Sequence, residues 1–152
     1  MKNMLKDAAI LFVITLIAGC LLGAVYEVTK EPIHQHEACQ SVFEDADTFE
    51  QIELSEQALT EAATIEEEFS TTIDEVSAAK DQNGAVLGYV ITVTNHEGYG
   101  GDIQFAMGIQ DDGTLNGISI LSIGETAGLG MRANTDAFKD QFKDKKVDKF
   151  EY

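Results

Sequence analysis

The sequence predicts an α+β protein: one N-terminal transmembrane helix followed by an antiparallel β-meander with short helices. Three observations carry this prediction. Residues 8–26 hold no charge over nineteen positions. Residues 86–95 and 102–110 are β-branched and aromatic, or alternate apolar with polar side chains, as strands do. Asn83-Gly84 precedes the first of these segments and is a strong hairpin signal.

The uncharged run is long enough to cross a membrane. A helix rises about 1.5 Å per residue, so nineteen residues approach the roughly 30 Å of a bilayer's hydrocarbon core. Asp7 and Glu27 close the run on its two sides. A chain of 152 residues is short for wrapping a helix that is apolar all round. We therefore expect residues 8–30 to form a transmembrane helix.

Charge predicts the orientation of that helix. Lys2 and Lys6 precede it, whereas residues 31–79 hold fourteen Asp or Glu and no Lys or Arg. By the positive-inside rule, residues 1–7 are a cytoplasmic tail and residues 31–152 form an extracytoplasmic domain. The expected location is the cell membrane, with a single pass and a cytoplasmic N-terminus.

A second interpretation of the same stretch is a lipid anchor. Residues 17–20, Ile-Ala-Gly-Cys, resemble the lipobox of a bacterial lipoprotein, in which cleavage precedes the Cys. The uncleaved helix is favoured because the apolar run continues six residues past Cys20 and the chain starts at Met1. Under either interpretation the domain is tethered to the outer side of the membrane.

The net charge of −17 argues against nucleic acid and against a polybasic lipid-binding role. It also repels a small anionic ligand unless a helix end, a basic group or a covalent bond compensates. Cys20 and Cys39 lie about 28 Å apart along a continuous helix, too far for a disulfide. The cluster of residues 34–39, with two His, one Glu and one Cys, is interpreted as a solvated segment and not as a metal site.

The remaining elements follow in order. Glu31-Pro32 is expected to end or bend the first helix. Ser55 is expected to start a helix that reaches Phe69. The other expected elements are a short helix over 36–45, strands over 49–54, 70–80, 86–95, 102–110 and 114–122, and a helix-like run over 138–150. The short helices are expected to pack on one face of the sheet.

The most informative loop is the glycine-rich segment Gly-Glu-Thr-Ala-Gly-Leu-Gly at 124–130, which follows the last predicted strand. Its glycines permit positive φ and let a ligand approach the backbone. Composition alone favours a plain flexible loop over a ligand site. Leu129, between two glycines, nevertheless suits the face of an aromatic ligand.

The order of motifs resembles a known family. YVITVTN, GYGGDI, a DG turn, GISIL and GETAGLG together resemble the FMN-binding domain shared by two proteins. These are the G subunit of the Rnf ferredoxin:NAD oxidoreductase and the C subunit of the sodium-translocating NADH:quinone reductase. LIAGCLLGAVYEVTKEPI is similar to the membrane anchor of the Rnf protein, and VFEDADTFEQIE to the segment after it. The anchor and the short middle region favour the Rnf protein.

The resemblance implies an electron-transfer flavoprotein subunit that relays electrons through FMN on the extracytoplasmic side. Its partners are the other membrane subunits of the translocase, including a second flavin-carrying membrane subunit, and membrane lipid. Ion transport, of sodium or of protons, belongs to the assembly. The chemistry is the flavin's, so no side chain is assigned a catalytic role and the subunit is not an enzyme alone. The implied FMN contacts are Glu125, Thr126, Gly128, Leu129 and Gly130, with Gly100 and Gly101 as weaker candidates.

Two departures from the family pattern stand out. Ala127 occupies the place of the family's Pro in Glu-Thr-Pro-Gly-Leu-Gly. Family members also attach FMN covalently, through a phosphoester, to the last Thr of a Ser-Gly-Ala-Thr motif, and that motif does not occur up to Tyr152. We therefore expect a partial subunit, incomplete at its C-terminus, with the attachment Thr beyond residue 152. Without that bond, the acidic chain is expected to bind FMN weakly.

Two rival interpretations of the function remain open. One is a membrane-anchored extracytoplasmic binding module without a cofactor. The other is an accessory subunit whose helix and meander only brace a complex.

Overall fold

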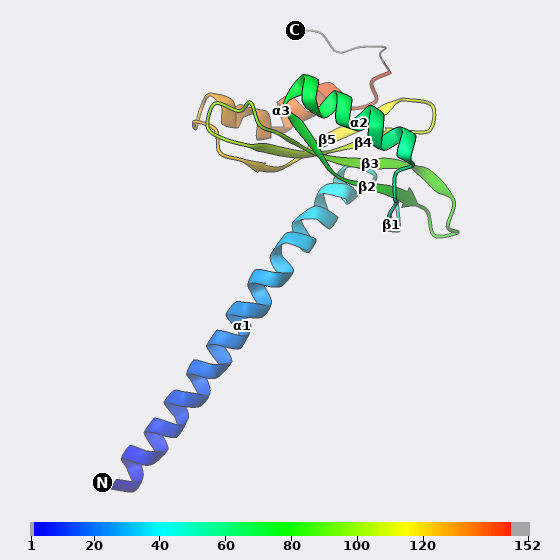
Figure 1. Cartoon of the computed structure of the whole chain (residues 1–152). Coiled ribbons are helices and arrows are strands. Elements are labelled where there is room, and N and C mark those ends of the chain that lie inside the picture. Colours follow the sequence, from blue (N-terminus) through cyan, green and yellow to red (C-terminus); the bar gives the residue numbers. More distant parts are fainter. Residues whose placement is uncertain (1, 147–152) are drawn as a thin grey trace. The chain divides into compact units, whose positions relative to one another are not determined.

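The structure is a computed structural model that describes the backbone of residues 2–146 and the side chains of residue 6, residues 11–26 and residues 34–146. Contacts divide the chain into two compact units, Met1–Gln35 and His36–Tyr152. The first unit is helical and the second holds the sheet (Figure 1). The predicted functional residues all lie in the second unit.

Helix α1 (Lys2–Val42) contains the predicted transmembrane segment. The side chains of residues 11–26 are exposed along the whole stretch. Within the described residues, no helical stretch combines the length and mean hydropathy of a membrane span. The transmembrane assignment of residues 8–30 therefore stays a prediction, and several of its side chains lie outside the described residues.

Of the two alternatives predicted for Glu31-Pro32, an end of the helix is wrong, because α1 continues through these residues to Val42, and a bend stays a prediction. A proline inside a helix removes one backbone hydrogen bond, and the turns on either side of it can still form. The short helix predicted over 36–45 is the final part of α1. Its side chains Ala38 and Val42 are buried against the sheet, and this packing stabilises the helix beyond the proline.

The five strands form one antiparallel sheet in the order β1-β2-β3-β4-β5. Their bounds are β1 (Thr48–Gln51), β2 (Thr71–Lys80), β3 (Val86–Asn95), β4 (Ile103–Gln110) and β5 (Leu115–Ile123). The predicted meander is confirmed. The first strand is shorter than the predicted 49–54, because the chain leaves the ladder and reaches the helix cap at Ser55.

The turns between strands form as their residues predict. The Asp81 carboxylate accepts hydrogen bonds from the N–H groups of Asn83 and Ala85, both at 2.8 Å. Gly84 has φ +80°, a conformation that glycine adopts without steric cost. In the next hairpin, Asp112 accepts a hydrogen bond from the N–H of Thr114 at 3.0 Å. These local bonds fix the register of the strands on either side.

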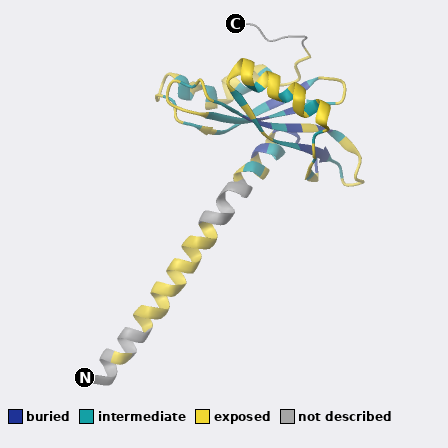
Figure 2. Cartoon of the chain, in the orientation of Figure 1, coloured by how far each residue is buried: buried dark blue, intermediate teal, exposed yellow. Residues whose placement is uncertain are grey.

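The core lies where the end of α1 meets one face of the sheet (Figure 2). Ala79, Val90 and Ala106 form the sheet side of this core, and Phe43, directly after α1, is buried against them. A Cβ atom at Gly108 would lie 3.0 Å from the Phe43 ring. A glycine at that strand position therefore makes the space that the aromatic ring fills.

The other face of the sheet carries the remaining helical segments, so the prediction that the short helices pack on one face is correct for these segments and wrong for the short helix predicted over 36–45. Helix α2 (Glu56–Phe69) contacts β2, and the segments η1 (Gly130–Asn134), α3 (Asp136–Lys139) and η2 (Asp140–Phe142) contact β5 (Figure 1). The end of α1 occupies the opposite face. Because side chains alternate along a strand, each face needs its own cover, and sequence periodicity does not say which helix supplies it.

The helix-like run predicted over 138–150 is also shorter in the structure. Helical backbone ends at Phe142, and Asp144 adopts φ 55°. Lys145 then pairs with Leu115 through two backbone hydrogen bonds of 2.7 and 3.0 Å. Pairing with the edge strand replaces further helical turns. Residues 147–150 of the predicted run lie outside the described residues.

Candidate functional site

Two loops leave the same end of the sheet. The first, residues 96–102, joins β3 to β4, and the second, residues 124–130, follows β5. The register pairs Asn95 with Ile103 and Ile103 with Ile123, which places the two loops next to each other. We call residues 98–101 and 124–130 the loop pair. It contains all seven residues predicted to contact a ligand.

A side chain of one loop is bonded to the backbone of the other. The N–H of Gly100 donates a hydrogen bond to Oε1 of Glu125 at 3.0 Å. The two backbones also approach closely, since a Cβ atom at Gly100 would lie 2.4 Å from the carbonyl oxygen of Gly124. Only glycine permits that approach. The structure therefore brings the weaker candidate Gly100 against the main candidate loop.

The other glycines of the loop pair serve different purposes. A Cβ atom at Gly130 would lie 2.6 Å from Oε2 of Glu125, so this glycine makes room for that side chain. Gly101 and Gly128 have φ +120° and +79°, with no atom within 4 Å of an added Cβ. These two positions need glycine for their backbone conformation, and the space beside them is open.

The loop pair presents two bulky side chains to solvent. Leu129 is 71% exposed and Tyr99 is 96% exposed. The second loop is itself closed by a turn, in which the carbonyl of Thr126 accepts hydrogen bonds from the N–H groups of Leu129 and Met131. The structure thus holds an apolar side chain on an ordered turn. The ligand contacts predicted from the sequence do not include Tyr99 or Gly98, although the motif Gly-Tyr-Gly-Gly contains both residues.

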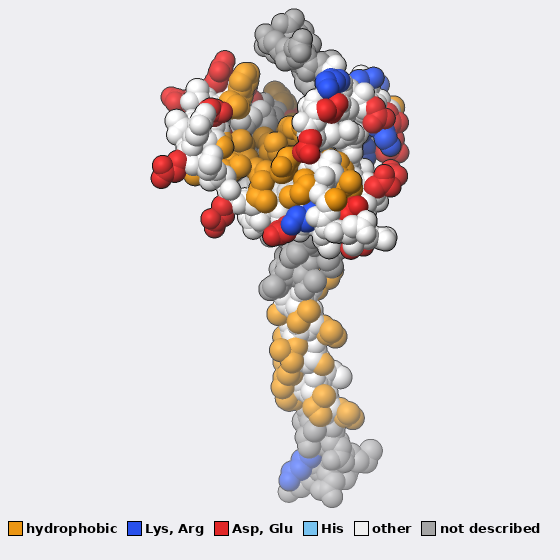
Figure 3. Space-filling model, turned by 90° about the vertical axis from the view of Figure 1, so that its right-hand side faces the viewer, with side chains coloured by type: hydrophobic (Ala, Val, Ile, Leu, Met, Phe, Trp, Pro, Cys, Tyr) orange, Lys and Arg blue, Asp and Glu red, His pale blue; other side chains and the backbone are white. Residues whose placement is uncertain are grey.

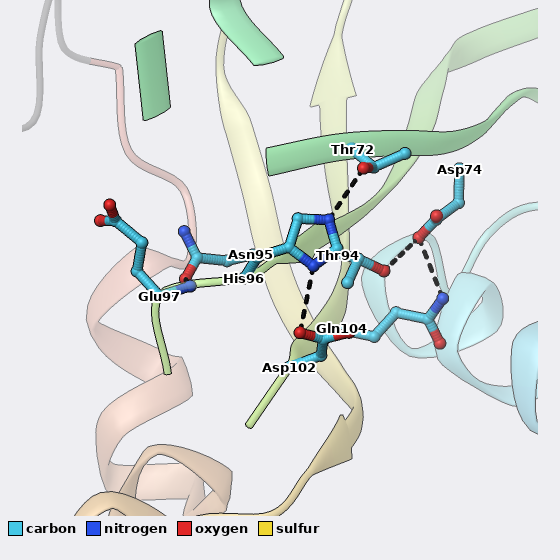
Figure 4. Close-up of polar contacts among 8 residues, drawn as sticks. All are labelled: Thr72, Asp74, Thr94, Asn95, His96, Glu97, Asp102 and Gln104. Atoms are coloured by element: carbon cyan, nitrogen blue, oxygen red, sulfur yellow. Dashed lines mark hydrogen bonds and ion pairs between the residues drawn. The ribbon is translucent and has the colours of Figure 1, made fainter. Parts of the chain in front are cut away.

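The base of the first loop is tied by a histidine (Figure 4). Nδ1 of His96 lies 3.1 Å from a carboxylate oxygen of Asp102, which closes the loop from side to side. Nε2 of the same ring lies 2.9 Å from the hydroxyl of Thr72 on β2. Next to this tie, the Asp74 carboxylate accepts hydrogen bonds from Thr94 and Gln104 at 2.6 and 2.9 Å. The histidine therefore anchors the loop to β2, and the Asp74 carboxylate links β2, β3 and β4 beside it.

The order hydroxyl, imidazole, carboxylate in Thr72, His96 and Asp102 matches the order in hydrolytic triads. The His96 and Asp102 side chains are exposed, and the bond from the ring to the Thr72 hydroxyl is at the surface. A solvated hydroxyl in this position gains nothing from a low local dielectric. The arrangement is better explained as a structural tie than as an activated nucleophile.

A second concave feature was missed by sequence reasoning. An apolar groove of about 520 Å³ lies on the sheet face opposite the end of α1, and Figure 3 shows hydrophobic side chains gathered in one area of the domain, bordered by acidic ones. Its floor includes Phe105, Met107 and Ile120, and its wall includes Phe138 and Phe142. Alternation in 102–110 predicted an apolar strand face, but did not show that this face is open.

Comparison with known proteins identifies two family regions in the chain. The RnfG N-terminal region matches residues 1–41, and the FMN-binding domain matches residues 98–151. The chain is 34% identical over 150 residues to the G subunit of the Na(+)-translocating ferredoxin:NAD(+) oxidoreductase complex of Acetobacterium woodii, covering 95% of this chain and 71% of that protein. The chain belongs to the G-subunit family of these complexes. The resemblance noted in the sequence is thereby confirmed.

Other members of the family are similar to this chain over nearly its whole length. The G subunit of the proton-translocating ferredoxin:NAD(+) oxidoreductase complex of Clostridium ljungdahlii is 30% identical over 156 residues, covering 94% of this chain and 74% of the relative. The G subunit of the ion-translocating oxidoreductase complex of Methanosarcina acetivorans is 29% identical over 150 residues, with coverages of 94% and 74%. Relatives named for sodium and for proton transport match about equally, so similarity does not assign the ion.

The loop pair fits one part of FMN better than the other. Open space beside Gly101 and Gly128, together with exposed Leu129, suits an apolar aromatic ring. The only ionisable side chains of the loop pair are Glu125 and Tyr99, and neither attracts a phosphate dianion. Arg132 follows in η1 and is the nearest Lys or Arg along the sequence. The loop pair is therefore suited to the isoalloxazine ring and not to the phosphate.

Proposed function

We propose that this chain is the electron-relaying FMN subunit of an ion-translocating ferredoxin:NAD(+) oxidoreductase complex. The observation that carries the proposal is a coincidence of two independent results. The FMN-binding domain matches residues 98–151. The loop pair lies inside that region, with open space beside Gly101 and Gly128 and an exposed Leu129. The relatives with the same span are named as subunits of such complexes.

Bound FMN supplies the one- and two-electron chemistry, and the protein's residues hold its ring. In this proposal Leu129 packs against the ring face, while the backbone at Gly101 and Gly128 lets the ring approach without a side chain in the way. Thr126, Gly100 and Gly130 shape the two loops through the contacts described above. The partners are the other subunits of the complex, including one that carries a second flavin.

The membrane topology is part of the same proposal. Residues 8–30 span the membrane, residues 1–7 face the cytoplasm and the FMN-bearing domain lies outside. Support comes from the apolar, exposed side chains of residues 11–26 and from the distribution of charge on either side of them. The exposed apolar side chains of this helix contact membrane lipid in this arrangement.

FMN titration of the purified full chain in detergent tests the ring site, with flavin fluorescence as the readout. We expect Leu129→Ala to weaken FMN binding about tenfold, since it removes most of one apolar contact surface. Leu59→Ala is the matched control, because Leu59 is also exposed, at 53% against 71%, but lies on α2 outside the loop pair. Equal affinities for the two variants would contradict the proposed site. Weak binding by the unaltered chain is itself expected, since the acidic chain gains little from the FMN phosphate without a covalent bond.

Labelling in intact cells tests the topology. A cysteine introduced by Asp111→Cys lies in the exposed turn between β4 and β5. We expect a membrane-impermeant maleimide to label it before lysis in a variant whose natural cysteines are replaced by serine. Labelling only after lysis would place the domain inside the cell and overturn the topology.

A further inference from the structure

We infer that Glu125 is a positioning residue, whose carboxylate locks the two loops of the pair together and does not bind the flavin. This inference rests on the proposed function for its consequence, but its structural content is independent of FMN. It gives the acidic residue of Glu-Thr-Ala-Gly-Leu-Gly a role that suits its charge, because a carboxylate facing an electron-rich or anionic ligand is unfavourable.

The carboxylate is already engaged by the protein itself. Oε1 accepts the N–H of Gly100 at 3.0 Å, across 25 positions of sequence. A hydrogen bond from a backbone N–H to a charged acceptor is stronger than one to a neutral acceptor. Through this bond a side chain of the second loop holds the tip of the first loop. It connects the loop that carries Tyr99 to the loop that carries Leu129.

Two glycines, Gly98 and Gly130, leave room for the Glu125 side chain, and Gly100 leaves room for the backbone at that residue. An added Cβ at Gly98 would lie 3.2 Å from Oε1, and one at Gly100 would lie 3.0 Å from Cα of Glu125. At Gly130 the added Cβ would lie 2.6 to 2.7 Å from Oε2, Cβ and Cγ of Glu125. Contacts under 3.0 Å with Cβ and Cγ cannot be relieved by rotating the end of the side chain. The glycines of both loops therefore accommodate this carboxylate, in addition to any ligand.

The inference predicts which part of the first loop is released when the Glu125 carboxylate is removed. The base of the first loop is tied independently, through His96 with Asp102 and Thr72, and the N–H of His96 also donates to the carbonyl of Ser70 at 2.9 Å. Removing the Glu125 carboxylate therefore releases the tip of the loop and leaves the base in place. The amide of Gly100 reports the tip, and the amide of His96 reports the base.

Amide hydrogen exchange of the full chain, measured residue by residue, tests the link. We expect Glu125→Ala to speed exchange at Gly100 about tenfold and to leave His96 unchanged. Glu125→Gln keeps an oxygen acceptor in place and is expected to hold exchange at Gly100 within about threefold of the unaltered chain. Unchanged exchange at Gly100 in Glu125→Ala would overturn the inference.

A double-mutant cycle separates this link from general damage to the loops. Gly130→Ala displaces Glu125, so it should speed exchange at Gly100 in the unaltered chain and add little in Glu125→Gly, which lacks the Cβ, Cγ and Oε2 atoms that an alanine at 130 would meet. Additive effects of Glu125→Gly and Gly130→Ala would show that the two residues are not coupled, and would overturn the inference.

Flavin measurements distinguish positioning from direct contact. If Glu125 only positions the loops, FMN affinity and midpoint potential in Glu125→Gln match the unaltered chain, while Glu125→Ala loses affinity. Loss of affinity or a shifted potential in Glu125→Gln, with Gly100 still protected, would assign the carboxylate to the ligand and overturn the inference. If FMN binding to the unaltered chain is too weak to measure without the covalent bond, the exchange experiments alone decide whether the link exists.

Discussion

The end of α1 and the residue after it, Phe43, pack against the sheet, and Phe43→Ala tests how much this packing contributes to stability. The ring is 4% exposed and lies beside Gly88 and Gly108, whose added Cβ atoms would come within 2.7 and 3.0 Å of it. Burying a large apolar side chain contributes about 1.5–3 kcal/mol, and the cavity left behind adds to the loss. Glycines have no side chains that could move into the cavity. We therefore expect a loss near the upper part of the ~3–5 kcal/mol range for Phe→Ala.

Urea unfolding followed by far-ultraviolet circular dichroism measures this loss in the full chain in detergent. A loss of this size is a large fraction of the ~5–15 kcal/mol that stabilises an ordinary domain. Phe69→Ala is the matched control, because the same ring on α2 is 55% exposed, and it should cost less than about 1 kcal/mol. A loss below about 1 kcal/mol for Phe43→Ala, or equal losses for the two variants, would refute the packing account.

Three further predictions follow from local contacts. Burial raises the pKa of Cys39 to about 11, with the charge of Glu75 as a second cause. The Cys39 thiol should therefore be alkylated about a hundredfold more slowly at pH 8 than a thiol of ordinary pKa. The protonated thiol contributes fully to stability below about pH 9, and this contribution should be lost as the pH rises toward 11. Hydrogen bonds from Lys146 and then Thr114 lower the pKa of Asp112 to about 2, so its contribution to stability is present above pH 3.8 and is lost as pH falls toward 2. Lys146→Met should raise that pKa in an NMR titration, and an unchanged midpoint would contradict the ion pair. Ser55→Ala removes the acceptor for the N–H of Ala58 and should cost about 1 kcal/mol, seen as faster amide exchange in the first turn of α2, whereas Ser55→Asp should not.

The strands and turns of this fold were predictable because their signals are local. Asn83-Gly84 and the alternation in 102–110 act over a few residues, and the structure forms the hairpin and the strand at those positions. The same holds for Ser55, whose side chain caps the helix that it was expected to start. Such contacts lie within a few residues of each other, so their chemistry can be seen in the sequence.

The errors arose where distant packing overrides local preference. Pro32 disfavours a helix, but α1 continues past it and ends against the sheet. The run at 138–150 has helical spacing, but its backbone turns at Asp144 so that Lys145 can pair with Leu115. In both places a contact with a residue far away in sequence decides the conformation.

The candidate site divides in the same way. The glycines and Leu129 marked residues 124–130 as a place where a ring could approach, and the motif order indicated the family to which the chain belongs. The sequence alone also determined the acidic charge and the uncharged N-terminal run. Only the tertiary structure decided that Gly100 meets Glu125, that Gly130 makes room for this carboxylate, and that an apolar groove stays open on the sheet. The physical reason is that these are contacts between segments separated by many residues, which exist only once antiparallel pairing has fixed the register of the strands.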